Sequence, residues 1–376
     1  MDNLTHSLVG LAAAKAGLER WSPGTTSLCI FAANAPDSDI VFLLFGDRWD
    51  FLQHHRGITH SIVGTLCLAL LIPLIFYVID LALSSLSGRA RKIRLGGLIV
   101  ASLIVSATHP ILDWTNNYGI RFLLPWNPKW FYGDLVFIVD PFIWLLFGSA
   151  SFLLTSKTRF QKICWAILAS AVTLLVIAAP RVGVLPRPFL ITAIWIGALC
   201  CVLLLFLRNA GERWGSKLAL LSFALLGAYW GALAFAHTRA LQLATGESAR
   251  LISSNDEKLM RLAAMPTLAN PLRWDCVFET GQATYRFNLR LGSGQPVGNV
   301  VRYPKPSAEL REALQSVSND RRTRVFLGFA RFPVATLAEP GCTTQTLVQL
   351  ADLRYTEPGR SRGTFSLELP VDCPNR

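Results

Sequence analysis

Six apolar segments of this 376-residue chain are each close to the length that a bilayer core requires. Only 16% of the residues are charged, against about 25% in an average soluble domain. The composition therefore predicts an integral membrane protein, mainly α-helical and polytopic, with about six spans. The predicted spans are residues 61–83, 95–112, 135–155, 163–180, 189–207 and 218–236.

The segment before the first predicted span is apolar but interrupted by polar residues. Residues 4–18 are typical of a short amphipathic helix, whereas the apolar stretch 27–45 contains Pro36, Asp37 and Asp39 in its middle. A broken helix at membrane depth is tolerated where its freed backbone lines a cavity or packs on protein. We therefore expect re-entrant or interfacial helices in this region.

Basic residues predict how the chain is oriented in the membrane. The loops 84–94, 156–162 and 208–217 are rich in Lys and Arg and alternate with poorly basic connections such as 181–188. The positive-inside rule places these three basic loops in the cytoplasm of a bacterial-type inner membrane. The N-terminal segment, the 113–134 connection and everything after residue 236 are then extracytoplasmic, and the ends of the first two spans at His60 and His109 share one membrane face.

From about residue 245 the apolar runs shorten and strand-like alternation appears, which divides the chain into a membrane domain, 1–244, and a β-rich soluble domain, 245–376. Helices are expected at 254–265 and 308–317. Strands are expected within 274–291, 297–303, 324–337, 344–355 and 363–369. In an oxidising compartment one disulfide is expected among Cys276, Cys342 and Cys373, with Cys342 to Cys373 preferred.

The formal net charge of +12 raises the question of a nucleic-acid partner. Ten of the basic residues lie in the three cytoplasmic loops, where they set topology, and the sequence contains no recognisable nucleic-acid-binding module. We therefore expect the lipid bilayer as partner and no nucleic acid.

Five of the six histidines fall within the first 109 residues, beside closely spaced carboxylates. Imidazole and carboxylate donors are typical of a divalent metal site, with zinc favoured over manganese and with one or two ions. The predicted ligands are His6, Asp37, Asp39, His55, His60, His109 and Asp113. Because the membrane topology brings His60 and His109 to one face, these scattered donors are predicted to converge.

Each motif by itself also has an ordinary structural interpretation. His109 and Asp113 in HPILD share one helix face at a spacing of four, which suits a common cation but also a helix-end hydrogen bond. PDSD alone describes an Asx-type turn, and HRGITHS alone describes an interfacial loop with polar anchors. In the metal-site interpretation of HRGITHS, the glycine permits a tight turn that aims both histidines inward, and Thr59 caps the following helix. His54 is expected to lie behind the ligands rather than among them.

Three further roles are predicted around the metal. Asp39 and His55 are each assigned as an additional ligand or the general base, and Arg121 is expected to hold an anionic substrate group, because guanidinium matches phosphate or carboxylate bidentately. Asp134 and Asp140 are alternatives for a further ligand or base.

The motifs MDNLTHSLVG, NAPDSD, HHRGITHS, HPILDWTNNYGIRFLLPW and FYGDLVFIVDP resemble the YdjM-type membrane-bound metal-dependent hydrolases, over residues 1–145. This resemblance implies a membrane-bound, metal-dependent hydrolase. Metal-activated water would act on a phosphoester or a lipid-linked, anionic envelope substrate. The alternative is a metal or ion transporter, or a metal-binding envelope assembly factor.

Overall fold

The computed structural model describes residues 1–88, 90–178, 188–253, 257–339, 344–360 and 363–373. Contacts divide the chain into two compact units. The first, here called the helical unit, comprises Met1–Ser38, Arg56–Ala234 and Leu268–Asn270. The second unit comprises Asp39–His55, Phe235–Thr267 and Pro271–Arg376. The division falls within one long helix, α11 (Ser216–Ser253).

Five helical segments among the described residues are long and apolar enough to cross a membrane. They are Thr25–Phe45, α5 (Ile62–Ser87), α6 (Leu95–Trp114), α8 (Arg159–Ala178) and α11. Two shorter apolar helices are α7 (Pro141–Thr155) and Thr192–Leu207, which is most of α9 (Pro188–Leu207). This confirms a mainly helical, multi-pass membrane protein with a separate β-rich part.

Two predicted spans differ from the observed helices. The segment predicted at 135–155 becomes helical only at Pro141, because the Asp140 side chain accepts hydrogen bonds from the backbone N–H groups of Phe142 (2.8 Å) and Ile143 (3.3 Å). Residues 135–139, before this cap, form bends and an isolated bridge between Val136 and Asn116. The span predicted to end at residue 236 continues as α11 to Ser253. The predicted connection 181–188 lies almost entirely outside the described residues.

The centre of the helical unit is formed by α1 (Asn3–Lys15), α2 (Thr25–Asn34) and α6, and α5 packs along α6. Gly10 lets α1 and α2 approach closely, since a Cβ there would lie 2.6 Å from the Cys29 carbonyl oxygen. Buried residues, among them Leu8, Val9 and Ala13, cover most of the α1 surface. The predicted amphipathic pattern of this helix is therefore wrong, because buried residues are spread around α1, whereas its interfacial or re-entrant position stays a prediction.

The predicted break in the 27–45 stretch is confirmed as a change of helix type. After α2 the chain forms a 3-10 helix, η2 (Ala35–Ile40), and then a short α-helix, α3 (Val41–Phe45). Pro36 and Asp37 lie in this 3-10 turn. The smaller diameter of the turn re-aims the side chains that follow α2 and gives Asp37 a direction that a continuous α-helix would not.

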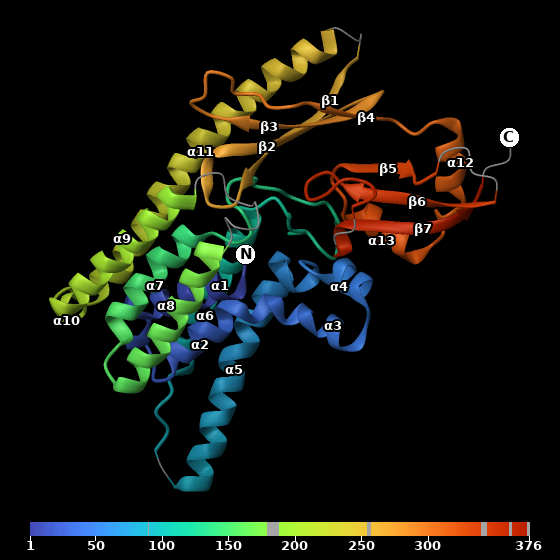
Figure 1. Cartoon of the computed structure of the whole chain (residues 1–376). Helices are drawn as coiled ribbons and strands as arrows, with labels where there is room; N and C mark the ends of the chain where they lie inside the picture. The colour runs from blue at the N-terminus through green and yellow to red at the C-terminus, as the bar shows by residue number, and fades with distance from the viewer. Residues whose placement is uncertain (89, 179–187, 254–256, 340–343, 361–362, 374–376) are drawn as a thin grey trace. The chain divides into compact units, whose positions relative to one another are not determined.

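From Leu259 onward, the described residues of the second unit form two antiparallel sheets together with the short helices α12 and α13 (Figure 1). The first sheet has the order β1-β2-β3-β4, with antiparallel pairing of β2, β3 and β4, and the second has the order β5-β6-β7. The helices α12 and α13 contact the second sheet. Their bounds are β1 Leu259–Thr267, β2 Asn270–Thr280, β3 Ala283–Arg290, β4 Val301–Pro304, α12 Ala308–Ser316, α13 Arg321–Phe329, β5 Pro333–Leu337, β6 Gln345–Asp352 and β7 Ser366–Asp372.

Two secondary-structure predictions in this unit are wrong. Of the helix expected at 254–265, residues 254–256 lie outside the described part of the chain, and Leu259 to Met265 belong to strand β1, because pairing with β2 and burial of Met265 outweigh the helix propensity of Ala and Met. In the strand expected at 324–337, the first residues instead belong to helix α13, and only Pro333–Leu337 form a strand, β5. Asp320 caps α13 by accepting a hydrogen bond from Arg322 N (2.7 Å). The helix predicted at 308–317 is confirmed as α12.

The cysteines of the second unit are only partly described. Cys276 is a buried free thiol, and burial raises its pKa. Cys373 is disulfide-bonded, whereas its predicted partner Cys342 lies outside the described residues.

A short helix from the N-terminal part of the chain belongs to the second unit. This helix, α4 (Arg48–His54), contacts α13, and its side chains Trp49 and Leu52 are buried. Arg321 at the start of α13 pairs with both Asp47 (3.5 Å) and Asp50. The chain segment between PDSD and HRGITHS is therefore held by the C-terminal β-rich domain.

Candidate metal centre

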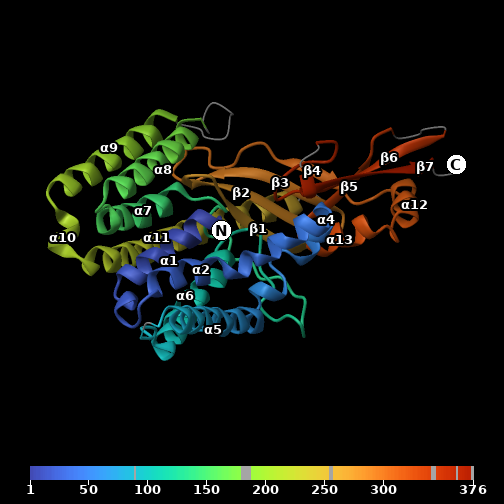
Figure 2. The ribbon, with the colours of Figure 1, turned by 90° about the horizontal axis from the view of Figure 1, so that it is seen from below.

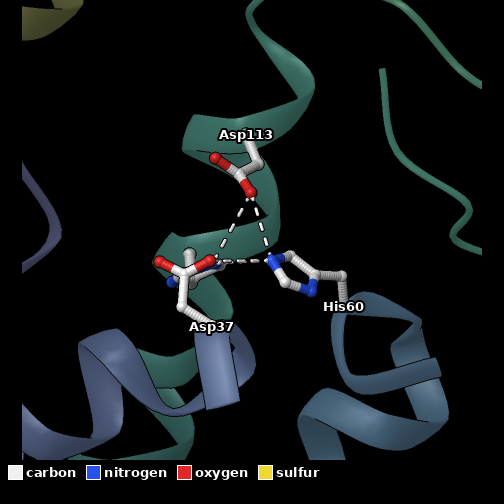
Figure 3. Close-up of side chains that lie close together, drawn as sticks. Asp37, His60 and Asp113 are labelled. Carbon is white, nitrogen blue, oxygen red and sulfur yellow. Dashed lines mark hydrogen bonds and ion pairs between the residues drawn. The ribbon is translucent and has the colours of Figure 1, made fainter. Parts of the chain in front are cut away.

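Four predicted ligands meet inside the helical unit, and they come from three different elements. Asp37 lies in η2, His60 ends the 3-10 turn η3 (Ile58–His60), and His109 and Asp113 lie one turn apart on α6. Figure 3 shows Asp37, His60 and Asp113 pointing toward one another. His60, His109 and Asp113 are almost completely buried, and one ligand atom from each of the four lies within 4.8 Å of every other.

The distances between these atoms match those expected around one ion. His60 Nε2 lies 3.1 Å from His109 Nε2 and 3.3 Å from both Asp37 Oδ1 and Asp113 Oδ2. His109 Nε2 lies 3.6 Å from Asp37 Oδ1 and 3.5 Å from Asp113 Oδ2. A tetrahedral ion bound at about 2.0–2.1 Å separates neighbouring ligand atoms by about 3.3–3.4 Å. The five distances that involve a histidine nitrogen therefore fit such an ion, and the two carboxylates lie within 4.8 Å of each other.

Hydrogen bonds on the far side of each ring turn both Nε2 atoms toward the centre. His109 Nδ1 donates to the Ala33 carbonyl at 2.6 Å, which leaves Nε2 as the free lone pair in the neutral ring. His60 Nδ1 lies 3.1 Å from the Thr59 hydroxyl. The two imidazole nitrogens face each other across 3.1 Å, so either a shared proton or a metal cation must separate their lone pairs, and the two flanking carboxylates favour a cation.

His6 lies directly beside these four donors. Its ring stacks on that of His109 with 3.7 Å between centroids, and its Nε2 lies 3.4 Å from Asp113 Oδ1. Burial, then the neighbouring His109, lowers the pKa of His6 well below its usual range, so the ring is neutral near pH 7. Within the described part of the chain neither ring nitrogen has a hydrogen-bond partner. A buried imidazole in this state is suited to act as a further ligand.

The position of His6 is fixed by the first turn of α1. Asp2 caps the helix by accepting from the backbone N–H of Thr5 (3.0 Å). The Trp144 indole N–H of α7 donates to both Asp2 Oδ1 and Thr5 Oγ1, each at 3.0 Å. The residue before His6 is thus tied to a neighbouring helix, which holds the imidazole against α6.

The sequence analysis missed the arginine of this centre, Arg56. Its guanidinium forms an ion pair with Asp113 Oδ1 (3.1 Å), donates to Asn116 Oδ1 (2.8 Å) and stacks over the Tyr118 ring. The side chain is only 2% exposed and its backbone has a φ of 52°. The signal was present in HHRGITHS, where Arg56 stands between two histidines. The α-amino group of Met1 also contacts Asp113.

Arg121, the predicted anion-binding residue, has a different setting. It is half-buried, and its guanidinium lies over the Trp130 ring at 4.7 Å from the centroid. None of its described contacts joins it to the four donors. The polar connection after Asp113 instead supplies Asn116, which holds Arg56.

Asp39 and His55 belong to the second unit, where they contact each other at 3.2 Å between Asp39 Oδ1 and His55 Nδ1. His54 stacks on Phe42 with 4.1 Å between ring centroids. The alternatives Asp134 and Asp140 are both buried. Asp140 caps α7 and accepts from the Tyr229 hydroxyl (2.9 Å), so its position has a structural explanation.

The turn that carries His60 depends on a glycine one turn into α5. The cap of α5 is Ser61 rather than the expected Thr59: its hydroxyl accepts from Gly64 N (3.0 Å) and donates to the Ile58 carbonyl (2.7 Å). A Cβ at position 64 would collide with that carbonyl oxygen.

We expect Gly64→Ala to lower the free energy of unfolding by about 1–3 kcal/mol and to weaken metal binding, because the His60 turn must shift.

Metal content and thermal unfolding of the purified protein check this expectation. The matched control is Gly96→Ala, since a Cβ at that position of α6 meets nothing within 4 Å. Equal metal content and equal stability in the two variants would show that the turn does not depend on Gly64.

The part of the chain that contains this site matches a known family. Residues 1–184 match the model of the YdjM inner membrane protein family. This N-terminal region belongs to the YdjM inner membrane protein family. All four donors, His6 and Arg56 lie inside the matched region, and the family description together with the apolar helices supports a multi-pass inner membrane protein.

The chain is also similar to the uncharacterized protein YfhP of Bacillus subtilis strain 168, with 28% identity over 155 residues. The match covers 39% of this chain and 43% of YfhP, so the chain spans less than half the length of that relative. No solved structure matches the chain.

Proposed function

We propose that this YdjM-family protein is a membrane-bound, metal-dependent hydrolase whose centre is formed by Asp37, His60, His109 and Asp113. The observation that carries the proposal is the set of distances of 3.1–3.6 Å that join two imidazole nitrogens to each other and to two carboxylate oxygens, in a largely buried cluster. Mixed nitrogen and oxygen donors favour zinc, with manganese as the alternative. A bound divalent ion would lower the pKa of a water molecule and polarise a phosphoryl or acyl oxygen.

The chain's own residues support hydrolysis in three ways. The Ala33 carbonyl and the Thr59 hydroxyl orient the rings of His109 and His60, respectively. Arg56 brings a permanent positive charge to the edge of the centre, where it balances Asp113. In this proposal Arg56 takes the role first assigned to Arg121, that of stabilising negative charge on the reacting group.

The general base that would take a proton from the attacking water is proposed separately from the metal ligands. Asp39 and His55, the two proposed alternatives for this base, form a carboxylate–imidazole pair, an arrangement that orients the ring. The proposed substrate is a phosphoester or a lipid-linked envelope compound, because an inner-membrane enzyme with a site at the end of its apolar helices meets lipid headgroups. The C-terminal domain is proposed to lie on the extracytoplasmic side.

The test is hydrolysis of chromogenic phosphate mono- and diesters and of lipid phosphates by the full chain in detergent. Removing the metal with a chelator is expected to reduce the rate by about 100-fold or more, since stabilisation of developing charge by the ion is worth several kcal/mol. Adding back zinc or manganese should restore the rate.

The matched variants are Asp113→Asn, which removes a ligand charge, and Asp372→Asn, which changes an exposed carboxyl of the second unit. Only the first is expected to lose hydrolysis. Protein that binds metal but hydrolyses no ester, with or without added ion, would contradict hydrolysis and favour the transporter or assembly-factor alternative.

A further inference from the structure

An apolar cavity of about 360 Å³ lies in the helical unit, between α1 and the helices α7, α8 and α9. Figure 2 shows α7, α8 and α9 side by side, and each of these three contacts the other two. The volume falls within the range of about 300–1,000 Å³ that is usual for small-molecule sites. The proposed hydrolase centre does not use this cavity.

The wall of the cavity offers almost nothing for water to bind. Three tryptophans line it, but each indole N–H donates to a side chain of the protein: Trp144 to Asp2, Trp165 to Thr155 and Trp195 to Thr173, at 2.8–3.0 Å. These three N–H groups are therefore already engaged and are not offered to a ligand in the cavity. A polar ligand or a water cluster would lack partners here, whereas an aliphatic chain matches the wall.

One end of the cavity carries a positive charge. Lys162, at the start of α8, is the charged residue among the described lining residues, and its ammonium lies over the Phe206 ring, 5.4 Å from the centroid. Lys157 and Arg159 precede it in the basic loop that the positive-inside rule places at the cytoplasmic surface. An amphiphile in the cavity would bring its headgroup to this end, where an anionic phosphate is attracted.

The cavity and the metal centre lie on opposite sides of α1. Leu4 and Leu8, one turn apart, line the cavity, whereas His6 lies two residues from each and about 200° around the helix. A lipid whose tail fills the cavity therefore cannot place its headgroup at the metal centre without passing around α1. The cavity therefore does not hold the acyl chain of a lipid substrate while its headgroup is hydrolysed at the metal centre.

We infer that the cavity between α1, α7, α8 and α9 binds an acyl chain of an anionic phospholipid whose phosphate pairs with Lys162. This lipid is a resident ligand rather than a substrate, and it supports the helix that carries His6. The inference does not depend on hydrolysis, since it predicts binding and not turnover.

The experiment is native mass spectrometry of the full chain in detergent after addition of phosphatidylglycerol or phosphatidylcholine. Wild-type protein is expected to retain one phosphatidylglycerol in preference to phosphatidylcholine. Ala169→Phe, which fills the cavity from α8, should abolish this retention, whereas Ala171→Phe, at an exposed position of the same helix outside the lining, should not. Lys162→Gln should weaken phosphatidylglycerol binding about five-fold, and Lys157→Gln should have less effect.

Two results would overturn the inference. One is equal retention of the two lipids by the wild-type protein. The other is unchanged phosphatidylglycerol binding in both Ala169→Phe and Lys162→Gln. If Ala169→Phe does not fold, the comparison of Lys162→Gln with Lys157→Gln decides alone. Metal content, measured on the same samples, should stay at the wild-type level in Lys162→Gln, so that failure here is distinct from failure of the metal proposal.

Discussion

Replacing His109 by alanine is expected to remove the bound metal from the purified protein. His109 Nε2 is one of four donors, and its ring position is fixed by the 2.6 Å hydrogen bond to the Ala33 carbonyl. Loss of a hydrogen-bond partner behind a ligand already costs about 10–100-fold in metal affinity, so loss of the ligand itself should cost at least about 100-fold. Elemental analysis after dialysis against metal-free buffer measures the result as ions per chain.

His54→Ala is the matched control for this prediction. His54 is exposed and stacks on Phe42 in the second unit. The substitution therefore removes an imidazole without changing any of the four donors. The helix content and membrane insertion of both variants should equal those of the wild-type protein, because His109→Ala leaves the apolar faces of α6 unchanged. Equal metal content in the two variants would refute the centre.

Replacing Arg56 by glutamine is expected to have the second-largest effect. Arg56 and Asp113 form an ion pair in which both side chains are almost completely buried, and breaking such a pair leaves an uncompensated charge. The free energy of unfolding should fall by about 3–5 kcal/mol. Any hydrolytic activity should fall as well, because Asn116 and Asp113 lose the group that joins them.

Arg121→Gln is the control for Arg56→Gln. Arg121 is half-buried and lies over Trp130, and a cation–π contact at an accessible site is worth about 0.5–1 kcal/mol. Unfolding in mixed detergent micelles measures both losses under the same conditions. Should Arg121→Gln destabilise the protein as much as Arg56→Gln does, the assignment of Arg56 as the arginine of the centre would fail.

The metal centre was predictable from sequence to the extent that it depends on local spacing and membrane topology. The i,i+4 spacing places His109 and Asp113 on one face of α6, and the alternation of basic loops brings His60 to the same region. Arg56 was not predictable in this way. Its position follows from a backbone φ of 52° and from a contact with Asn116, sixty positions along the chain, neither of which appears as a periodic pattern.

The fold shows the same division between local and long-range causes. Apolar length identified most of the membrane helices, and a polar face identified α12. Strand β1 was mistaken for a helix because its Ala and Met residues favour helix locally, while its conformation depends on pairing with β2. Likewise, the start of α7 depends on the Asp140 cap, which hydropathy does not register.

The docking of α4 onto α13 has a consequence for any shortened version of this protein. A fragment ending before β1 would contain every proposed ligand of the four-donor centre, yet it would lack the surface against which Trp49 and Leu52 are packed. Both side chains would then be exposed to solvent, on a chain segment that connects Asp37 to His60 and is no longer held by α13. We therefore expect a fragment limited to the family-matched region to be less stable than the full chain, because the C-terminal β-rich domain that covers these two side chains is absent.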